Sequence, residues 1–205
     1  MNNTVKNIDY SRPAGYIPEV MNALFNEAVF ESTDLKEMRD AFRVKQMQGK
    51  AWLLDAVEQY CSKDSRILVV GSWFGFTSFC LWKMGYTNIT EVDPDARLEK
   101  FAKHLNRFNK DFKHLTDDVN NIELDYDVVI NPSSEHIADH SWFTRMPKNT
   151  LMFIHNTDYV SNDHPNICKN LEEMINKYSM DYLYQGTFDL QTYKRFMLVG
   201  KKNER

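Results

Sequence analysis

The sequence predicts an α/β fold with a mostly parallel β-sheet and an antiparallel hairpin at the C-terminal edge. From residue 66 onward, short apolar segments typical of strands alternate with segments of helical periodicity. This alternation indicates parallel strands joined by crossover helices that cover both faces of the sheet. The last two strand patterns, 181–189 and 192–200, are too close together for a crossover helix, so we expect them to pair antiparallel.

Composition limits the class of protein. The 205 residues are 42% hydrophobic, which is enough for one globular domain with a sizeable core. The formal net charge of -4 provides no overall attraction to nucleic acid. The cysteines show no C-x-x-C spacing, and no apolar run approaches the ~20 residues that cross a membrane. We therefore expect a cytoplasmic protein without a disulfide framework, a structural zinc site or a membrane span.

The N-terminal part of the chain shows no strand pattern of its own, apart from an extended start. Residues 1–15 are predicted to form an extended arm, and helical patterns continue from there to about residue 61. The last of these helices carries Trp52 on an apolar face. We expect residues 1–62 to form an arm and a helical cap, and residues 63–205 to form a Rossmann-like domain.

The remaining elements follow in order along the chain. The strand patterns that precede the hairpin cover 66–71, 88–93, 112–115, 126–131 and 149–155. The helical patterns between and after them cover 76–84, 95–107, 138–146 and 165–178. With the hairpin, these patterns predict a seven-stranded sheet. Ligands of such sheets bind at the carboxyl ends of the strands, where the strand order reverses, so candidate site residues should directly follow the strands.

The first strand ends in a glycine turn, "GSWFG" at 71–75, and the next helix begins with Phe76, Thr77 and Ser78. Glycine allows positive φ and close approach of a ligand, and free amides at a helix N-terminus favour an anionic group. The spacing matches neither a dinucleotide-binding loop nor a P-loop. We therefore consider Gly71, Ser72, Trp73, Gly75 and Thr77 as a ligand loop, with an ordinary strand–turn–helix connection as the alternative.

Acidic residues follow the second and third strands. Asp93 lies 22 residues beyond Gly71, and its two oxygens are suited to accept from both hydroxyls of a ribose. The alternative role, a cap for the next helix, suits Asp95 better. Asp117 and Asp118 follow the third strand, where two adjacent acids also fit a solvated turn.

Polar groups gather after the fourth and fifth strands. The fourth is followed by "NPSSEH", and the fifth by "HNTDY". Such clusters suit proton transfer or substrate orientation, although a polar loop that caps a helix is the alternative. Candidate residues are Asn131, Ser133, Ser134, Glu135, His136, His155, Asn156, Asp158 and Tyr159. Because Glu135, His136, His155 and Asp158 lack tight ligand spacing, we expect no metal ion; the roles of His140 and His164 stay open.

Together these segments resemble known proteins. Five parallel strands followed by a hairpin, over about residues 60–202, resemble the class I S-adenosylmethionine (SAM) methyltransferase fold. The motifs are similar to those of small phage and bacterial methyltransferase-like proteins, which have a Gly-Gly-Trp-Tyr-Gly turn and an Asn-Thr-Ser-Cys-Glu-His segment. This chain has "GSWFG", "NPSSEH" and, at 195–200, "RFMLVG" in place of Arg-Phe-Met-Leu-Ile-Gly. "GKAWLLDAV" at 49–57 is similar to the element that precedes the first strand in that group.

The resemblance implies a SAM-dependent methyltransferase that acts on a small molecule or an accessible side chain. The turn would hold the methionine part of SAM, Asp93 the ribose and Asp118 the adenine edge, with Asn131 close to the cofactor. Glu135 or His136 would orient or deprotonate the acceptor, with His155 and Asn156 opposite. "NPSS" lacks the aromatic residue of base-directed methyltransferases, so a nucleic-acid acceptor is disfavoured.

Two alternatives share the same cofactor site. The first is an enzyme that transfers the aminocarboxypropyl group of SAM, or that cleaves or cyclises SAM. The second is a SAM-binding module without catalysis. A nicotinamide oxidoreductase is disfavoured by the glycine spacing.

Overall fold

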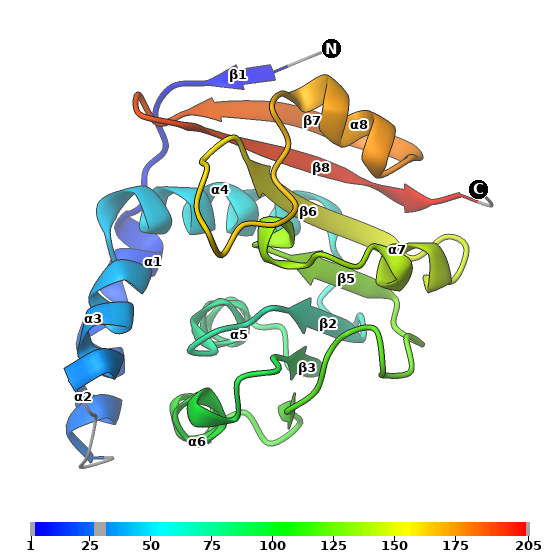
Figure 1. Ribbon diagram of the computed structural model, residues 1–205. Coiled ribbons are helices and arrows are strands. Elements are labelled where there is room, and N and C mark those ends of the chain that lie inside the picture. The colour runs from blue at the N-terminus through cyan, green and yellow to red at the C-terminus, as the bar shows by residue number, and fades with distance from the viewer. Residues whose placement is uncertain (1–2, 27–31, 204–205) are drawn as a thin grey trace.

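The computed structural model describes residues 3–26 and 32–203, and the side chains of 24–26 and 32–36 lie outside this description. Residues 1, 2 and 27–31 of the predicted arm and cap also lie outside it. Within the described residues, the chain forms one sheet with the strand order β1-β7-β8-β6-β5-β2-β3-β4 (Figure 1). The strands are β1 (Asn3–Val5), β2 (Ile67–Val70), β3 (Ile89–Val92), β4 (Lys113–Leu115), β5 (Val128–Asn131), β6 (Leu151–Thr157), β7 (Met180–Asp189) and β8 (Lys194–Lys202).

The predicted fold class is confirmed. Strands β2 to β6 pair in parallel, and β8 pairs antiparallel with both β6 and β7. The sheet has eight strands instead of the predicted seven, because residues 3–5 of the predicted arm pair in parallel with the outer edge of β7. A three-residue strand without regular alternation gives no recognisable pattern in the sequence.

Helices cover both faces of the sheet. The helices are α1 (Ser11–Gly15), α2 (Ile17–Asn26), α3 (Ser32–Ala41), α4 (Val44–Tyr60), α5 (Phe76–Lys83), α6 (Ala96–Leu105), α7 (Ser141–Arg145) and α8 (Leu171–Lys177), with the 3₁₀ turn η1 (Ser134–His136). Helices α7 and α8 are shorter than the predicted 138–146 and 165–178, because the residues before each helix form loops. Ala138 and Asp139, before α7, line the cavity described below.

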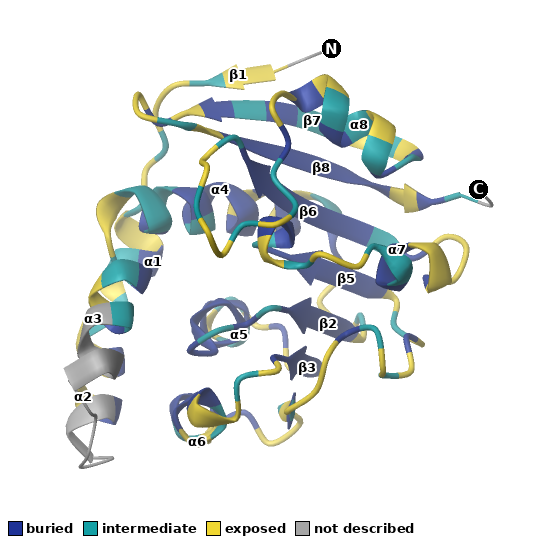
Figure 2. Cartoon of the chain, viewed as in Figure 1, coloured by how far each residue is buried: buried dark blue, intermediate teal, exposed yellow. Residues whose placement is uncertain are grey.

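The central strands are buried on both sides, as Figure 2 shows for β2, β5 and β6. Ile67 and Val69 of β2 pack into the same apolar cluster as α4, α5 and α6. Leu68 and Val70 face the opposite cluster, which contains α7 and α8. Burial on both faces explains why β2 is a continuous apolar run without polar alternation.

Helix α4 belongs to the layer that covers the sheet. Its Trp52 and Leu53 are buried in the cluster that includes Ile67 of β2. The Trp52 ring lies 5.7 Å from the ring of Phe188 on β7, measured between centroids. Because α4 shares this cluster with β2, these contacts do not separate a cap from the sheet, and the domain boundary after residue 62 stays a prediction. Among the described residues, no helix is both long enough and apolar enough to span a bilayer.

Candidate functional site

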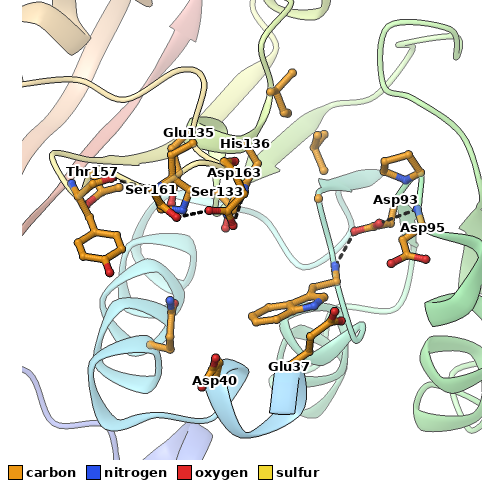
Figure 3. A pocket seen from close by; sticks show the side chains of 18 of the residues that line it. Glu37, Asp40, Asp93, Asp95, Ser133, Glu135, His136, Thr157, Ser161 and Asp163 are labelled. Carbon is orange, nitrogen blue, oxygen red and sulfur yellow. Dashed lines mark hydrogen bonds and ion pairs between the residues drawn. The ribbon is translucent and has the colours of Figure 1, made fainter. Parts of the chain in front are cut away.

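The carboxyl ends of β2, β3 and β5 surround a cavity of about 1280 Å³. Strand β2 lies between β3 and β5, so the strand order reverses at this point, where a ligand site is expected. The loop after β6 and the N-terminus of α4 complete the wall (Figure 3). The candidate residues that line this cavity are Gly71, Trp73, Asp93, Asp117, Asp118, Ser133, Glu135, His136 and Tyr159.

The turn after β2 has an unusual backbone. Gly71, Trp73 and Gly75 all have positive φ, at 64°, 52° and 70°. This conformation costs a residue with a side chain roughly 1–2 kcal/mol. At Trp73 the cost is offset by a hydrogen bond, because its amide donates to Oδ2 of Asp93 over 2.8 Å. Trp73 is half-buried and lines the cavity.

Asp93 connects two loops at the floor of the cavity. Its side chain is buried, and its other oxygen accepts from the amide of Asp95 over 3.0 Å. Burial raises the pKa of Asp93, while the two amide hydrogen bonds lower it. The predicted helix cap is Asp95, whose Oδ1 accepts from the amide of Arg97. Each oxygen of Asp93 has a second lone pair, so the carboxylate remains able to accept from a ligand.

Gly75 does not line the cavity, contrary to its predicted ligand role. A Cβ at this position would lie 3.0 Å from Cβ of Ala102 on α6, so the glycine allows α5 and α6 to pack closely. Ser72 and Thr77 also lie outside the main cavity. They line an adjoining recess of about 30 Å³, where the hydroxyl of Ser72 is buried without a hydrogen-bond partner among the described residues.

Acidic side chains line the β3–β4 side of the cavity. Asp117 and Asp118 are exposed there, and Oδ1 of Asp118 accepts from the amide of Asn120 over 2.8 Å. Figure 3 shows Asp93 and Asp95 on this side, with Glu37 below them. This side therefore presents mainly hydrogen-bond acceptors.

The loop after β5 supplies a buried carboxylate. Glu135 is 2% exposed, and one of its oxygens, Oε1, lies 3.8 Å from the guanidinium of Arg195. Its other oxygen, Oε2, is buried without a hydrogen bond within the described chain. His136 is exposed on the cavity wall, and its Nδ1 lies 2.9 Å from the carbonyl oxygen of Asp163.

Asn131 supports this loop from within the core. Its Oδ1 accepts from the amide of Ser133 over 3.1 Å, and the side chain is fully buried. Asn131 does not line the cavity, although its Nδ2 is buried without a partner among the described atoms. Both roles predicted for it, in cofactor binding and in catalysis, therefore stay predictions.

His155 and Asn156, near the carboxyl end of β6, lie outside the main cavity. His155 is buried against Trp52 and lines only the small recess. Burial and the charges of Arg195 and Lys50 hold its pKa well below the usual value, so it is neutral. Asn156 does not line the cavity, because its amide group is used in contacts with Ser134 and with the loop around residues 166–168.

Sequence patterns did not identify the basic residues of the site. Arg195 is buried. Its guanidinium donates to the carbonyl oxygen of Pro132 over 3.1 Å and to Oε1 of Gln46 over 3.4 Å. Lys50 lines the same recess, and burial and the charge of Arg195 lower its pKa to about 8. Gly49 makes room for Arg195, because a Cβ there would lie 3.2 Å from Cδ of Arg195. One feature of the sequence could have pointed to these residues: Lys50 and Arg195 each lie in an otherwise apolar segment, "GKAWLLDAV" and "RFMLVG".

Solved structures share the fold of this chain. The 1,6-didemethyltoxoflavin-N1-methyltransferase of Burkholderia thailandensis, with bound 1,6-didemethyltoxoflavin and S-adenosylhomocysteine, has a TM-score of 0.62 at 12% identity, and the match covers 93% of this chain and 91% of that one. Magnesium protoporphyrin IX methyltransferase of Synechocystis PCC 6803, with bound S-adenosylhomocysteine, has a TM-score of 0.60 at 11% identity, covering 88% and 99%.

A further match is the N-methyltransferase NodS of Bradyrhizobium japonicum WM9, with a TM-score of 0.59 at 9% identity, covering 78% of this chain and 98% of that one. No protein-family model and no curated protein matches the sequence. At these identities the likeness establishes the fold alone. The chain has the Rossmann-like α/β fold found in these methyltransferases.

Proposed function

We propose that the protein is a SAM-dependent methyltransferase that acts on a small molecule or an accessible side chain. One observation supports this function above the others: the cavity at the strand-order reversal has opposite chemical character at its two sides. Its recess contains Lys50 and Arg195, and its opposite side carries Asp93 and Asp118. SAM has a carboxylate at one end and hydroxyl and amine donors at the other.

The residues of the recess fit the carboxylate end of SAM. Arg195 lies 3.8 Å from the buried carboxylate of Glu135, and Lys50 adds a second positive charge beside Arg195. The recess therefore has an excess of positive charge that an anionic ligand group would neutralise. The buried hydroxyl of Ser72 lacks a partner there, and a ligand carboxylate would accept its hydrogen bond. In this proposal Asp93 accepts from the ribose hydroxyls, and Asp118 accepts from the adenine amine.

SAM supplies a methyl group already activated by the adjacent sulfonium. The chain therefore has to hold donor and acceptor in line and to exclude water, which accounts for much of the rate enhancement in such reactions. Trp73 restricts solvent access next to Asp93, and Glu135 and His136 face the space left for the acceptor. His155 is buried in the recess, outside the main cavity, so we assign it no proton transfer.

A thermal-shift experiment tests this function. SAM and S-adenosylhomocysteine should each stabilise the full-length protein, because a ligand that binds only the folded state raises its stability. At 100 times the dissociation constant the gain is about 2.7 kcal/mol, which raises Tm by roughly 5–10 °C in a protein of this size. NAD and ATP serve as controls and should produce smaller shifts. Absence of any shift with SAM and S-adenosylhomocysteine would reject the proposal.

Mass spectrometry of the products then separates the chemical alternatives. Methyl transfer yields S-adenosylhomocysteine, whereas transfer of the aminocarboxypropyl group or cleavage of SAM yields methylthioadenosine. A SAM-binding module without catalysis would yield neither product with any acceptor tested.

The affinity for SAM should depend on the protonation of Lys50. The pKa of Lys50 is lowered to about 8, and a bound carboxylate favours the charged ammonium form. Affinity should therefore fall, by up to about tenfold per pH unit, as the pH rises above 8. Calorimetry from pH 7 to pH 9.5 measures this dependence.

Matched variants isolate the contribution of the lysine. The α-amino group of the ligand titrates near the same pH, so only the difference between the wild type and Lys50→Met reports on Lys50. Lys113→Met, on the distant edge strand β4, should retain the wild-type profile. Identical pH profiles for the wild type and Lys50→Met would place the carboxylate elsewhere.

A further inference from the structure

Two histidines and one glutamate converge on the wall of the cavity. Glu135 and His136 come from η1 after β5, and His164 comes from the loop after β6, 28 residues further along the chain. One potential ligand atom from each residue lies within 4.8 Å of the others. In Figure 3, Glu135, His136 and Asp163 lie together, across the cavity from Asp93.

The hydrogen bonds of both histidines leave the same ring nitrogen available. Nδ1 of His136 lies 2.9 Å from the carbonyl oxygen of Asp163, and Nδ1 of His164 lies 2.8 Å from that of Tyr159. A carbonyl oxygen only accepts, so each Nδ1 must carry the proton. In the neutral form each Nε2 then keeps its lone pair. Histidines that bind metals typically show this arrangement, with the second ring nitrogen donating to a carbonyl or carboxylate.

The carboxylate provides an independent indication of a ligand. Glu135 is 2% exposed, and its Oε2 is buried without a hydrogen bond within the described residues. Its Oε1 lies 3.8 Å from Arg195, which also donates to the carbonyl oxygen of Pro132. A buried carboxylate oxygen without a partner is costly, and a bound cation would remove that cost.

We propose that Glu135, His136 and His164 bind a divalent transition-metal ion. Two imidazoles and one carboxylate suit Zn²⁺ and neighbouring first-row ions, and three protein ligands leave a coordination position open. Ligand atoms of a tetrahedral zinc site lie about 3.3 Å apart, so the side chains furthest apart would have to close by up to about 1.5 Å. This proposal replaces the sequence-based expectation of no metal ion. In the structure His164 lies close to Glu135 and His136, whereas His155 and Asp158 do not belong to this group.

All three ligand residues line the cavity in which we place the acceptor, so an acceptor with an oxygen atom could take the remaining coordination position. This role rests on the proposed methyltransferase function, whereas the binding of the ion does not. A bound ion lowers the pKa of a hydroxyl group that coordinates it. The hydroxyl proton leaves to solvent, the oxygen forms the bond to the methyl carbon, and the carbon–sulfur bond breaks with its electron pair on sulfur.

Metal binding to the full-length protein tests the site. After treatment with a chelator, the protein should bind one equivalent of Zn²⁺ or Co²⁺ in calorimetry. The visible spectrum of the Co²⁺ form should show the bands of a four- or five-coordinate site without thiolate charge transfer, because Cys61, Cys80 and Cys168 are buried and are not ligands in this proposal. Failure to bind either ion, or a thiolate band, would overturn it.

Variants connect the binding to the three residues. His164→Ala should weaken Zn²⁺ binding by at least about 10- to 100-fold. This is the loss usually seen when a residue that hydrogen-bonds to a metal ligand is removed, and loss of a ligand itself should cost no less. The matched control His104→Ala, on α6 and outside the cavity wall, should bind like the wild type. Glu135→Gln provides a second test should His164→Ala fail to fold, which circular dichroism determines. Unchanged affinity in a folded His164→Ala or Glu135→Gln would refute the site.

A parallel titration separates this inference from the proposed function. The chelator-treated protein and His164→Ala should still be stabilised by SAM, because His164 is not one of the proposed cofactor residues and Asp93 and Asp118 come from the loops after β3 and β4. Stabilisation by SAM without metal binding rejects the metal site alone. Metal binding without any effect of SAM keeps the site and rejects the methyltransferase role.

Discussion

Replacing Asp93 with alanine should lower the affinity for SAM by roughly 10- to 100-fold. The expected loss follows from removal of a charged acceptor, whose hydrogen bonds contribute about 1.5–3 kcal/mol each. The substitution also removes the acceptor of the Trp73 amide, which holds that residue in its positive-φ conformation. Calorimetric titration of SAM into the variant measures the change.

Two further variants make the result specific. Asp93→Asn keeps the size of the side chain but replaces one acceptor oxygen with a donor, so it should also weaken binding. Asp181→Asn, on the exposed face of β7 far along the sheet, should leave the affinity unchanged. The ribose assignment is wrong if Asp93→Ala binds SAM as tightly as the wild type.

Replacing Glu91 with alanine should lower the free energy of unfolding by roughly 2–6 kcal/mol, because it leaves two buried hydrogen-bonding partners unsatisfied at about 1–3 kcal/mol each. Glu91 is fully buried on β3, accepts from the hydroxyl of Ser78 over 2.6 Å and lies 2.8 Å from Nδ1 of His114. Burial raises the pKa of Glu91, and these two hydrogen bonds lower it. In a protein of this size the change corresponds to a fall in Tm of roughly 10 °C, measurable by calorimetry or circular dichroism.

A double-mutant cycle with His114 tests the cause of this loss. His114→Ala in the Glu91→Ala background should cost less than in the wild type, because the partner of the imidazole is already absent. The control is Glu99→Ala on α6, where a solvent-accessible ion pair with Lys103 should contribute little to stability. Additive effects in the cycle would show that the pair does not act as a unit.

The arrangement of the sheet was predictable because its signal is local. Each buried parallel strand is a continuous apolar run, and each crossover helix has its own period, so the order of elements can be read along the chain. The direction of parallel strands then places Gly71, Asp93, Asp118 and Glu135 at one edge of the sheet. The cap at Asp95 was also predictable, because capping depends on neighbouring residues.

The composition of the site was only partly predictable. Gly75 and Asn156 are themselves predicted site residues, but their surroundings come from α6 and from the loop around residues 166–168. Lys50 and Arg195 meet in the recess because α4 packs on the sheet beside β8. This packing brings together two residues that are 145 positions apart in the sequence. The periodicity of the segment around Lys50 or of the segment around Arg195 does not predict such a contact.

Thus the sequence by itself determined the fold class, the edge of the sheet at which polar groups gather and the acidic residues that follow β3 and β4. These depend on local periodicity and on the fixed direction of parallel strands. Only the tertiary structure decided which groups are buried without partners and which charges face one another. It brings Lys50 next to Arg195 and His164 next to Glu135. Such pairings arise from contacts between distant segments, and they determine the chemistry that we propose for the cavity.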